Sequence, residues 1–121
     1  MADLLSGRNI LVVEDEMLIM MMIESMLADL GCEQVTAAAT VSQAIDLIGR
    51  MDFDAAMLDM NLDGQASYEV ADRLAQRGVP FMFSTGSSEQ DIRPEYRDRP
   101  VLRKPFSEHE LTAIFSSLFP R

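Results

Sequence analysis

Five polar side chains stand where short apolar segments of the chain give way to charged or hydroxyl residues. They are Glu14, Asp15, Asp59, Thr85 and Lys104. Carboxylates that lie close together repel and raise one another's pKa, so a hard divalent cation is the expected neutraliser. Mg²⁺ suits a few carboxylates with several waters and leaves coordination positions for phosphate oxygens, which a hydroxyl also binds. These residue types therefore predict a magnesium site that receives phosphate, and Asp59 is the residue expected to carry the chemistry.

Asp59 follows the run 55–58, which is apolar throughout. A run of this length is typical of a strand buried on both faces of a sheet. In an open α/β sheet the ligand crevice lies outside the carboxyl ends of the strands, so Asp59 would enter that crevice. Taken alone, Asp59 is also typical of the start of a solvated turn, because Asp63-Gly64 follows. The polar residues at the other strand ends favour the crevice.

Lys104 is the only lysine of the chain, beside nine arginines. A surface charge could be either lysine or arginine. A single lysine placed after a strand and before Pro105 indicates that the site needs a compact ammonium. Chance retention of one lysine is the alternative.

The elements that must position these residues alternate along the chain. Four helices are predicted. The first spans 17–30, the second begins at a cap formed by Thr40 or Ser42, and the third spans 67–77. The last begins at a capping box of Ser107 and Glu110 and runs to about residue 119. Apolar runs predict strands at 9–13, 34–38, 53–58, 80–84 and 100–103.

Five strands alternating with helices predict a doubly wound, flavodoxin-like parallel sheet with helices on both faces. The carboxyl ends of parallel strands share one edge, so the five polar residues should converge there. Between the last two strands Pro94 falls where a helix is expected, so we expect that fourth helix to be short or irregular. In the helix over 17–30, the expected inner face consists of Leu18, Met21, Met22, Ser25 and Met26, with methionine as core filler.

Composition bounds the class of protein. The chain has 121 residues, 48% of them hydrophobic, and we expect one domain over 1–121. Cys32 is alone, which favours a buried, inert thiol in a reducing, cytoplasmic environment. No apolar run approaches the roughly 18 residues of a membrane span. The formal charge of −10 argues against direct nucleic-acid binding, because the chain lacks the basic surface that counterion release needs.

Two motifs are weaker than they look. Residues 59–64 begin like an EF-hand loop, but Val70 stands where a bidentate glutamate is required, so calcium binding is not expected. His109 is the only histidine and lies inside the last predicted helix, where a solvated position is expected.

Four arginines near Lys104 are interleaved with acids and predict a mixed solvated face or, alternatively, a partner-docking face. They are Arg93, Arg97, Arg99 and Arg103.

The ordered set of strand-end motifs resembles the receiver domain of bacterial two-component response regulators, over essentially the whole chain. The motifs are Glu14-Asp15, Asp59, Thr85-Gly86 and Lys104-Pro105-Phe106. The resemblance implies the sheet order 2-1-3-4-5. It also implies that Asp59 is the phosphoacceptor for a histidine kinase and that the Lys104–Pro105 peptide is cis.

Further roles follow from the same resemblance. Mg²⁺ would be held by Asp15, Asp59 and the backbone carbonyl of Asn61, with Glu14 assisting through water. Lys104 would bind a phosphoryl oxygen, and Thr85 would follow it as the switch. These parts suit a transfer that depends on positioning and charge neutralisation.

The chain departs from the commonest receiver pattern at Val101, the third residue before Lys104, where many receivers carry a switching aromatic. The run Phe83-Ser84-Thr85-Gly86 is similar to an alphaproteobacterial group of stand-alone receivers marked by Phe-Ala-Thr-Gly, which often lack a regular fourth helix.

We therefore expect a single-domain response regulator, a monomer or weak dimer that switches a downstream protein partner near strands four and five. It would assist its own phosphorylation and dephosphorylation without being an enzyme in the ordinary sense. Two alternatives stay open. A magnesium-dependent phosphatase with an aspartyl-phosphate intermediate would use similar residues, although it usually needs a second acid where Asn61 stands. An unphosphorylated pseudo-receiver adaptor is the other.

Overall fold

Strands and helices alternate in the computed structural model, which describes residues 4–62, 65–86 and 92–119. The strands of its larger sheet are β1 (Asn9–Val13), β2 (Gln34–Ala38), β3 (Ala55–Asp59), β6 (Phe81–Thr85) and β7 (Val101–Arg103). The helical elements are α1 (Met17–Asp29), α2 (Val41–Arg50), α3 (Tyr68–Gln76), the 3₁₀ turn η1 (Pro94–Tyr96) and α4 (Glu108–Leu118). None of these described helices has the length and apolar character needed to cross a bilayer.

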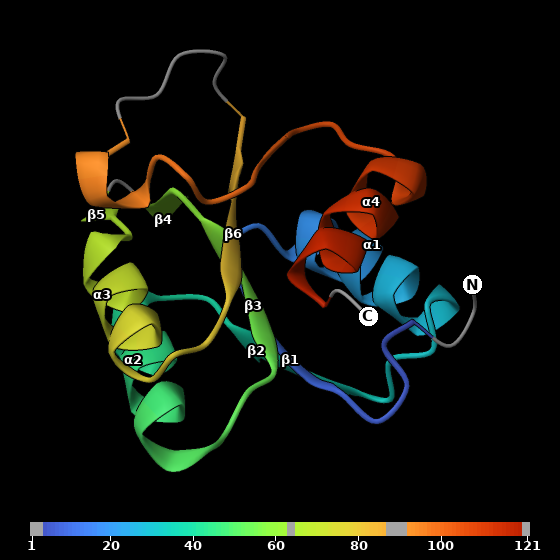
Figure 1. The fold of residues 1–121 in the computed structure, drawn as a ribbon, viewed down its shortest axis with the longest axis horizontal. Helices are drawn as coiled ribbons and strands as arrows, with labels where there is room; N and C mark the ends of the chain where they lie inside the picture. The colour runs from blue at the N-terminus through green and yellow to red at the C-terminus, as the bar shows by residue number, and fades with distance from the viewer. Residues whose placement is uncertain (1–3, 63–64, 87–91, 120–121) are drawn as a thin grey trace.

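The five strands lie in the order β2-β1-β3-β6-β7, and every neighbouring pair is parallel. This confirms the predicted flavodoxin-like order. Helices cover both faces: α1 and α4 lie on one side of the sheet, and α2 and α3 lie on the other (Figure 1). Because all five strands point the same way, their carboxyl ends meet at one edge of the sheet.

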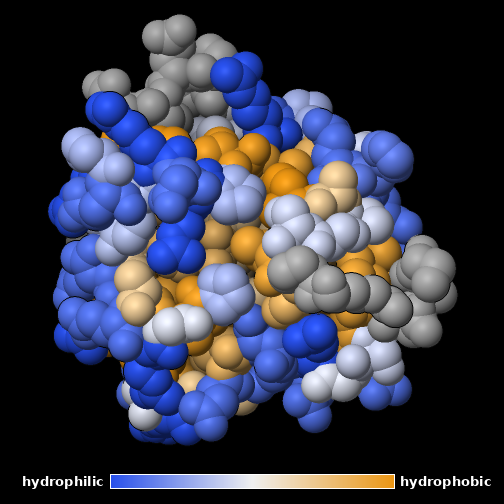
Figure 2. Space-filling model, viewed as in Figure 1, coloured by the Kyte–Doolittle hydropathy of each residue, from blue (hydrophilic) through white to orange (hydrophobic). Residues whose placement is uncertain are grey.

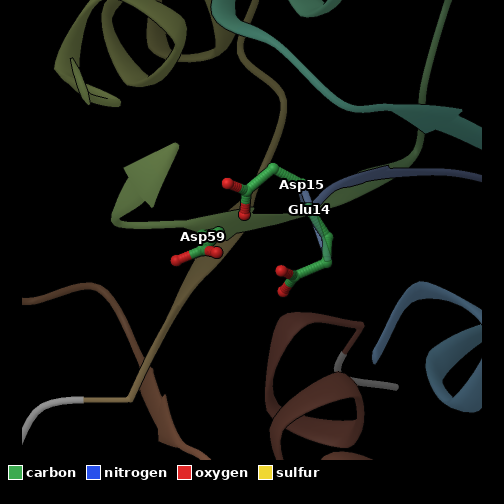
Figure 3. A group of neighbouring side chains, drawn as sticks. All are labelled: Glu14, Asp15 and Asp59. Carbon is green, nitrogen blue, oxygen red and sulfur yellow. The ribbon is translucent and has the colours of Figure 1, made fainter. Parts of the chain in front are cut away.

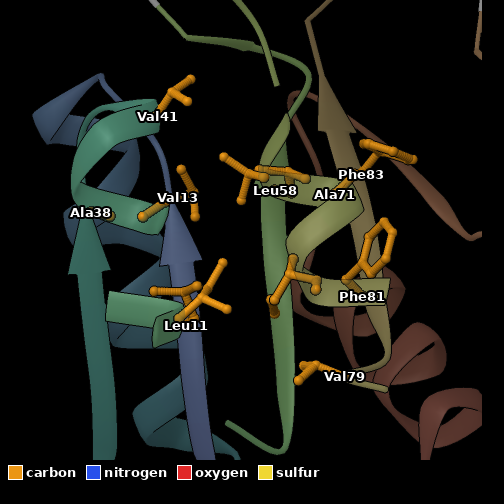
Figure 4. Close-up of a cluster of buried hydrophobic side chains, with 14 of the residues drawn as sticks. Leu11, Val13, Ala38, Val41, Leu58, Ala71, Val79, Phe81 and Phe83 are labelled. Carbon is orange, nitrogen blue, oxygen red and sulfur yellow. The ribbon is translucent and has the colours of Figure 1, made fainter. Parts of the chain in front are cut away.

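Alternate residues of each central strand enter two separate cores, since successive side chains of a strand point to opposite faces. In β1, Leu11 and Val13 pack with residues of α2 and α3, whereas Ile10 and Val12 pack with residues of α1 and α4. Figure 4 shows part of the core beneath α2 and α3. Figure 2 shows apolar atoms between the two helical layers and mostly hydrophilic side chains over α2 and α3. The central strands, which end in the polar residues, are therefore packed between helices on both faces of the sheet.

Capping residues start α2 and α4 as predicted. The Thr40 hydroxyl accepts a hydrogen bond from the backbone N–H of Gln43 at 3.0 Å and caps α2. Ser107 and Glu110 form the predicted capping box at the start of α4. Gly78, which follows α3, has a φ of +70°, a conformation that favours glycine.

The predicted inner face of α1 is wrong for most of its residues. The structure buries Ile23 and Leu27 instead, and of the predicted residues only Met26 is partly buried. The cause is that every residue from 17 to 23 is apolar, so the spacing of apolar residues does not distinguish the buried face of the helix from the exposed one. The predicted residues that are exposed are Leu18, Met21, Met22 and Ser25.

Two further features separate the structure from the predicted elements. A short antiparallel pair, β4 (Asn61–Leu62) and β5 (Gln65–Ala66), follows β3 and was not predicted. Between β6 and β7, the part of the chain that the structure describes contains the three-residue turn η1, which confirms the expected short fourth helix.

Candidate functional site

Three carboxylates converge at the carboxyl ends of β1 and β3. Glu14 and Asp15 follow β1 directly, and Asp59 is the last residue of β3. One oxygen from each carboxylate lies within 4.8 Å of the others (Figure 3). Glu14 and Asp59 are buried, with 2% and 6% of their surface exposed, whereas Asp15 is exposed. The site therefore has two acids set into the sheet edge and a third at its rim.

Backbone N–H groups orient two of these carboxylates. The N–H of Glu16 donates to Oε2 of Glu14 at 3.1 Å, and the N–H of Asn61 donates to Oδ1 of Asp59 at 3.2 Å. Each donor lies two residues beyond its acceptor, where the chain turns away from the strand. Both carboxylates keep a second oxygen for other partners.

Lys104, which follows β7, bridges the two buried acids. Its ammonium donates to Oε1 of Glu14 at 2.7 Å and to Oδ2 of Asp59 at 3.1 Å. Burial raises the pKa of Glu14, and the charge of Asp59 adds to that increase, while the hydrogen bond from Lys104 opposes both. Burial alone would lower the pKa of Lys104, but the bond to Glu14 and the charges of Asp59 and Glu14 outweigh burial and raise that pKa. Lys104 is therefore a cation at neutral pH.

The hydroxyl residues at the end of β6 complete the edge. Ser84 lies opposite Asp59 in the register of β3 and β6, and Thr85 follows Ser84; both residues are buried. The backbone N–H of Lys104 donates to the carbonyl of Thr85 at 2.8 Å, so β6 also positions the lysine. The Lys104–Pro105 peptide bond is cis, as predicted.

The structure thus brings all five predicted strand-end residues to one edge. The role predicted for the carbonyl of Asn61 stays a prediction. Sequence reasoning missed the direct pairing of Glu14 with Lys104, for which the lone lysine was the available signal. Ser84, the last residue of the strand predicted at 80–84, lies at the same edge. Val101 is 38% exposed on β7, and His109 is exposed on α4.

The oxygen donors at this edge fit Mg²⁺, a hard cation that is usually bound by one or two carboxylates together with waters. Glu14 and Asp59 both contact Lys104, and Asp15 lies exposed at the rim, so the three acids together are the candidate ligands. The ammonium of Lys104 supplies a second positive charge beside Asp59. A cation and an ammonium around one carboxylate suit the handling of a transferred phosphoryl group.

Comparison with known proteins gives a consistent result. A family model described as the response regulator receiver domain matches residues 10–116 of the chain. SdrG from Sphingomonas melonis Fr1 is 41% identical, with a TM-score of 0.83 over 95% of this chain and 97% of SdrG. A structure of SdrG in its BeF3-activated conformation gives 40% identity and a TM-score of 0.80, over 93% of this chain and 97% of SdrG.

Two further relatives bear on the site and on chain length. The receiver domain of the sensor histidine kinase PA1611 from Pseudomonas aeruginosa PAO1, solved with a magnesium ion in its active site cleft, is 29% identical. Its TM-score is 0.79 over 93% of this chain and 98% of that domain. The transcriptional regulatory protein PdtaR of Mycobacterium tuberculosis is 29% identical over 91% of this chain. The chain spans 56% of the length of PdtaR.

Proposed function

Because the chain belongs to the response regulator receiver domain family, we propose that it is a phosphorylation-controlled switch of protein interactions in the cytoplasm. Asp59 accepts a phosphoryl group from a histidine kinase, and the modified chain alters its binding to a downstream protein partner near β6 and β7. The observation that carries this proposal is the meeting of Asp59 with Lys104 and two further carboxylates at one sheet edge.

In the proposed transfer, a carboxylate oxygen of Asp59 attacks the phosphorus of a phosphohistidine. A P–O bond forms while the P–N bond breaks, and its electron pair stays on the imidazole nitrogen, which then binds a proton. Lys104 holds a phosphoryl oxygen, and the Thr85 hydroxyl donates to another. Asp15, Asp59 and the Asn61 carbonyl would hold Mg²⁺, which neutralises charge that builds up on the phosphoryl oxygens.

The exposed side of α1 supplies a docking surface for the phosphodonor. Of the large hydrophobic residues exposed in the described part of the chain, most lie in the first two turns of α1. Leu18, Met21 and Met22 are 82%, 57% and 39% exposed and stand at i, i+3 and i+4, so they form one stripe along the helix. Such a stripe suits packing against another helix, and methionine adapts to varied partners.

The helix that carries this stripe begins at the rim of the site. Met17, the first residue of α1, comes two residues after Asp15. A hollow of about 230 Å³ lies beside it, lined by Asp15, Met17 and Met20 together with residues 37–39. A donor helix that docks on this surface would lie next to Asp15 and the other acids of the site. We therefore place the helix that carries the kinase's phosphohistidine against the α1 stripe.

The experiment for the function is intact-mass spectrometry after incubation with Mg²⁺ and acetyl phosphate. We expect one phosphoryl adduct on the wild-type chain, dependent on Mg²⁺ and absent in Asp59→Asn. Asp46→Asn is the matched control, because Asp46 is an exposed acid of α2 that forms an ion pair with Arg50 on the surface of the same helix. Continuous release of phosphate from many esters would favour the phosphatase. Failure to accept phosphate from any small donor or histidine kinase would favour the adaptor.

The docking surface has its own test. Met21→Gln should slow phosphotransfer from the cognate histidine kinase and leave phosphorylation by acetyl phosphate unchanged. Met51→Gln is the control, since Met51 is exposed at the end of α2, away from the α1 stripe. An equal effect of Met21→Gln on both donors, or no effect on either, would count against docking on α1.

A further inference from the structure

Four side chains hold η1 and the residue before it against α3. We call Tyr68, Asp72, Arg93 and Tyr96 the tyrosine latch. The Tyr96 hydroxyl donates to the Asp72 carboxylate, and the Arg93 guanidinium lies 3.6 Å from the other oxygen of that carboxylate. The backbone N–H of Arg93 donates to the Tyr68 hydroxyl at 3.1 Å. The two tyrosine rings are stacked, with centroids 6.2 Å apart and planes 9° apart.

The latch rests on the face of β6 that packs with α2 and α3. Phe83 contacts both tyrosines, with ring centroids 6.3 Å from Tyr68 and 6.2 Å from Tyr96. Phe81 lies 5.7 Å from Tyr96, and Figure 4 shows Phe81 and Phe83 along the same strand. Thr85 comes two residues after Phe83, so strand alternation puts it on the same face. One face of β6 therefore runs from the latch to Thr85, the residue after the one that pairs with Asp59.

A backbone connection joins the latch to the residue that follows Asp59. The N–H of Met60 donates to the carbonyl of Ser84 at 3.0 Å, and the carbonyl of Met60 accepts from the N–H of Ser67 at 3.2 Å. Ser67 is the N-cap of α3, and Tyr68 is its first residue. A shift of the chain just beyond Asp59 would therefore reach Tyr68 through hydrogen-bonded backbone.

The described arrangement is that of an unmodified Asp59, because the Lys104 ammonium contacts the carboxylate itself. A phosphoryl group carries about two negative charges and three acceptor oxygens, and it would compete for Lys104 and for the Thr85 hydroxyl. A movement of Thr85 toward Asp59 would shift the end of β6, the strand whose Phe81 and Phe83 contact the two tyrosines. Packed interiors of this kind change between discrete arrangements instead of deforming gradually.

We infer that the tyrosine latch is closed while Asp59 is unmodified and opens when Asp59 is phosphorylated, so that it supplies the coupling for which other receivers use an aromatic at the place of Val101. This inference rests on the proposed function. Opening would release η1 from α3 and change the surface beside β6 and β7, where we place the downstream partner. Val101 itself is a half-exposed aliphatic residue of β7.

Coupling between two sites is reciprocal, so weakening the latch must favour the modified state. Tyr96→Phe removes one hydroxyl and keeps the ring. Asp72 is 43% exposed, so its freed carboxylate oxygen reaches water and the fold is retained. The loss of one hydrogen bond corresponds to about a two- to tenfold change in an equilibrium constant. We expect Tyr96→Phe to bind beryllium trifluoride with Mg²⁺ that much more tightly than the wild type.

The chain carries its own reporter of the latch. It has two tyrosines, Tyr68 and Tyr96, and no tryptophan. Near-ultraviolet circular dichroism of tyrosine therefore reports on the latch alone. We expect beryllium trifluoride with Mg²⁺ to change this signal in the wild type and to leave it unchanged in Asp59→Asn. Asp72→Asn should bind beryllium trifluoride more tightly, as Tyr96→Phe does, while the matched control Asp46→Asn on α2 should not.

The outcomes separate the latch from the proposed function. A phosphoryl adduct on Asp59 with an unchanged tyrosine signal, or with wild-type affinity in Tyr96→Phe, overturns the latch and leaves the phosphoacceptor role intact. No adduct on Asp59 from any donor overturns the proposed function and the latch together. An adduct with a changed tyrosine signal and tighter binding in both latch variants supports the inference.

Discussion

The Lys104 ammonium lies 2.7 Å from Oε1 of Glu14, a carboxylate whose side chain is 1% exposed. Lys104→Met removes this partner and leaves a buried negative charge beside Asp59. Removing one member of a buried ion pair costs about 3–5 kcal/mol. We expect the free energy of unfolding, measured by urea denaturation at neutral pH in the absence of Mg²⁺, to fall by that amount.

The double variant Glu14→Gln/Lys104→Met is the control for this loss. It removes the buried charge as well as its partner, so most of the lost stability should return. If the double variant is as unstable as Lys104→Met, the loss comes from packing of the lysine stem and the buried pair is not its cause.

Addition of Mg²⁺ should stabilise the folded chain, because the cation neutralises acids that repel one another only in the folded state. At a Mg²⁺ concentration of 100 times the dissociation constant, the expected gain is about 2.7 kcal/mol. Asp15→Asn removes an acid from the rim of the site and should reduce the gain. Thermal unfolding with and without Mg²⁺ measures it, and Asp46→Asn should behave as the wild type. An equal gain in Asp15→Asn would show that Mg²⁺ binds elsewhere.

Two leucines of α1 offer a direct comparison of the buried and exposed faces. Leu27 is 0% exposed, and Leu18 is 82% exposed. Leu27→Ala should lower the free energy of unfolding by about 2–5 kcal/mol, because it leaves a cavity against the sheet. Leu18→Ala makes the same chemical change in water and should alter stability by no more than about 0.5 kcal/mol. Similar losses in urea denaturation would mean that the α1 stripe is covered in solution.

The same two leucines show why the buried face of α1 could not be predicted from the sequence. Leu18 and Leu27 lie on a helix that is apolar through residues 17–23, so the period of its apolar residues could not separate the face toward the sheet from the face toward solvent. The packing of α1 on the sheet and beside α4 selects Ile23 and Leu27.

The positions of the site residues could be predicted better than the inner face of α1, because the topology of the sheet determines them. Once short strands alternate with helices, the sheet is parallel and the residues after its strands must meet at one edge. Asp59 and Lys104 are 45 residues apart in the chain and form an ion pair for this reason. The tyrosine latch follows no such rule. Tyr68, Asp72 and Tyr96 meet through side-chain packing of an irregular segment, for which the sequence holds no periodic signal.

Tyr96 should make stability depend on pH in the alkaline range. Burial, followed by the hydrogen bond to Asp72 and the charge of that carboxylate, raises the pKa of Tyr96 from 10.0 to about 12. The folded chain therefore holds this proton more tightly than the unfolded chain. The resulting stability is fully present below pH 10 and is lost as the pH rises to about 12. A shift of this size corresponds to about 2–3 kcal/mol.

The measurement is the urea midpoint of wild type and Tyr96→Phe across this pH range. We expect the stability advantage of the wild type to shrink as the pH rises, because Tyr96→Phe has no phenol at this position to ionise. Absorbance of tyrosinate in the folded protein gives an independent reading: the wild type should show a transition near pH 12 that Tyr96→Phe lacks. If both proteins lose stability in parallel, the Tyr96 phenol is not held by Asp72 in solution and the latch loses its central hydrogen bond.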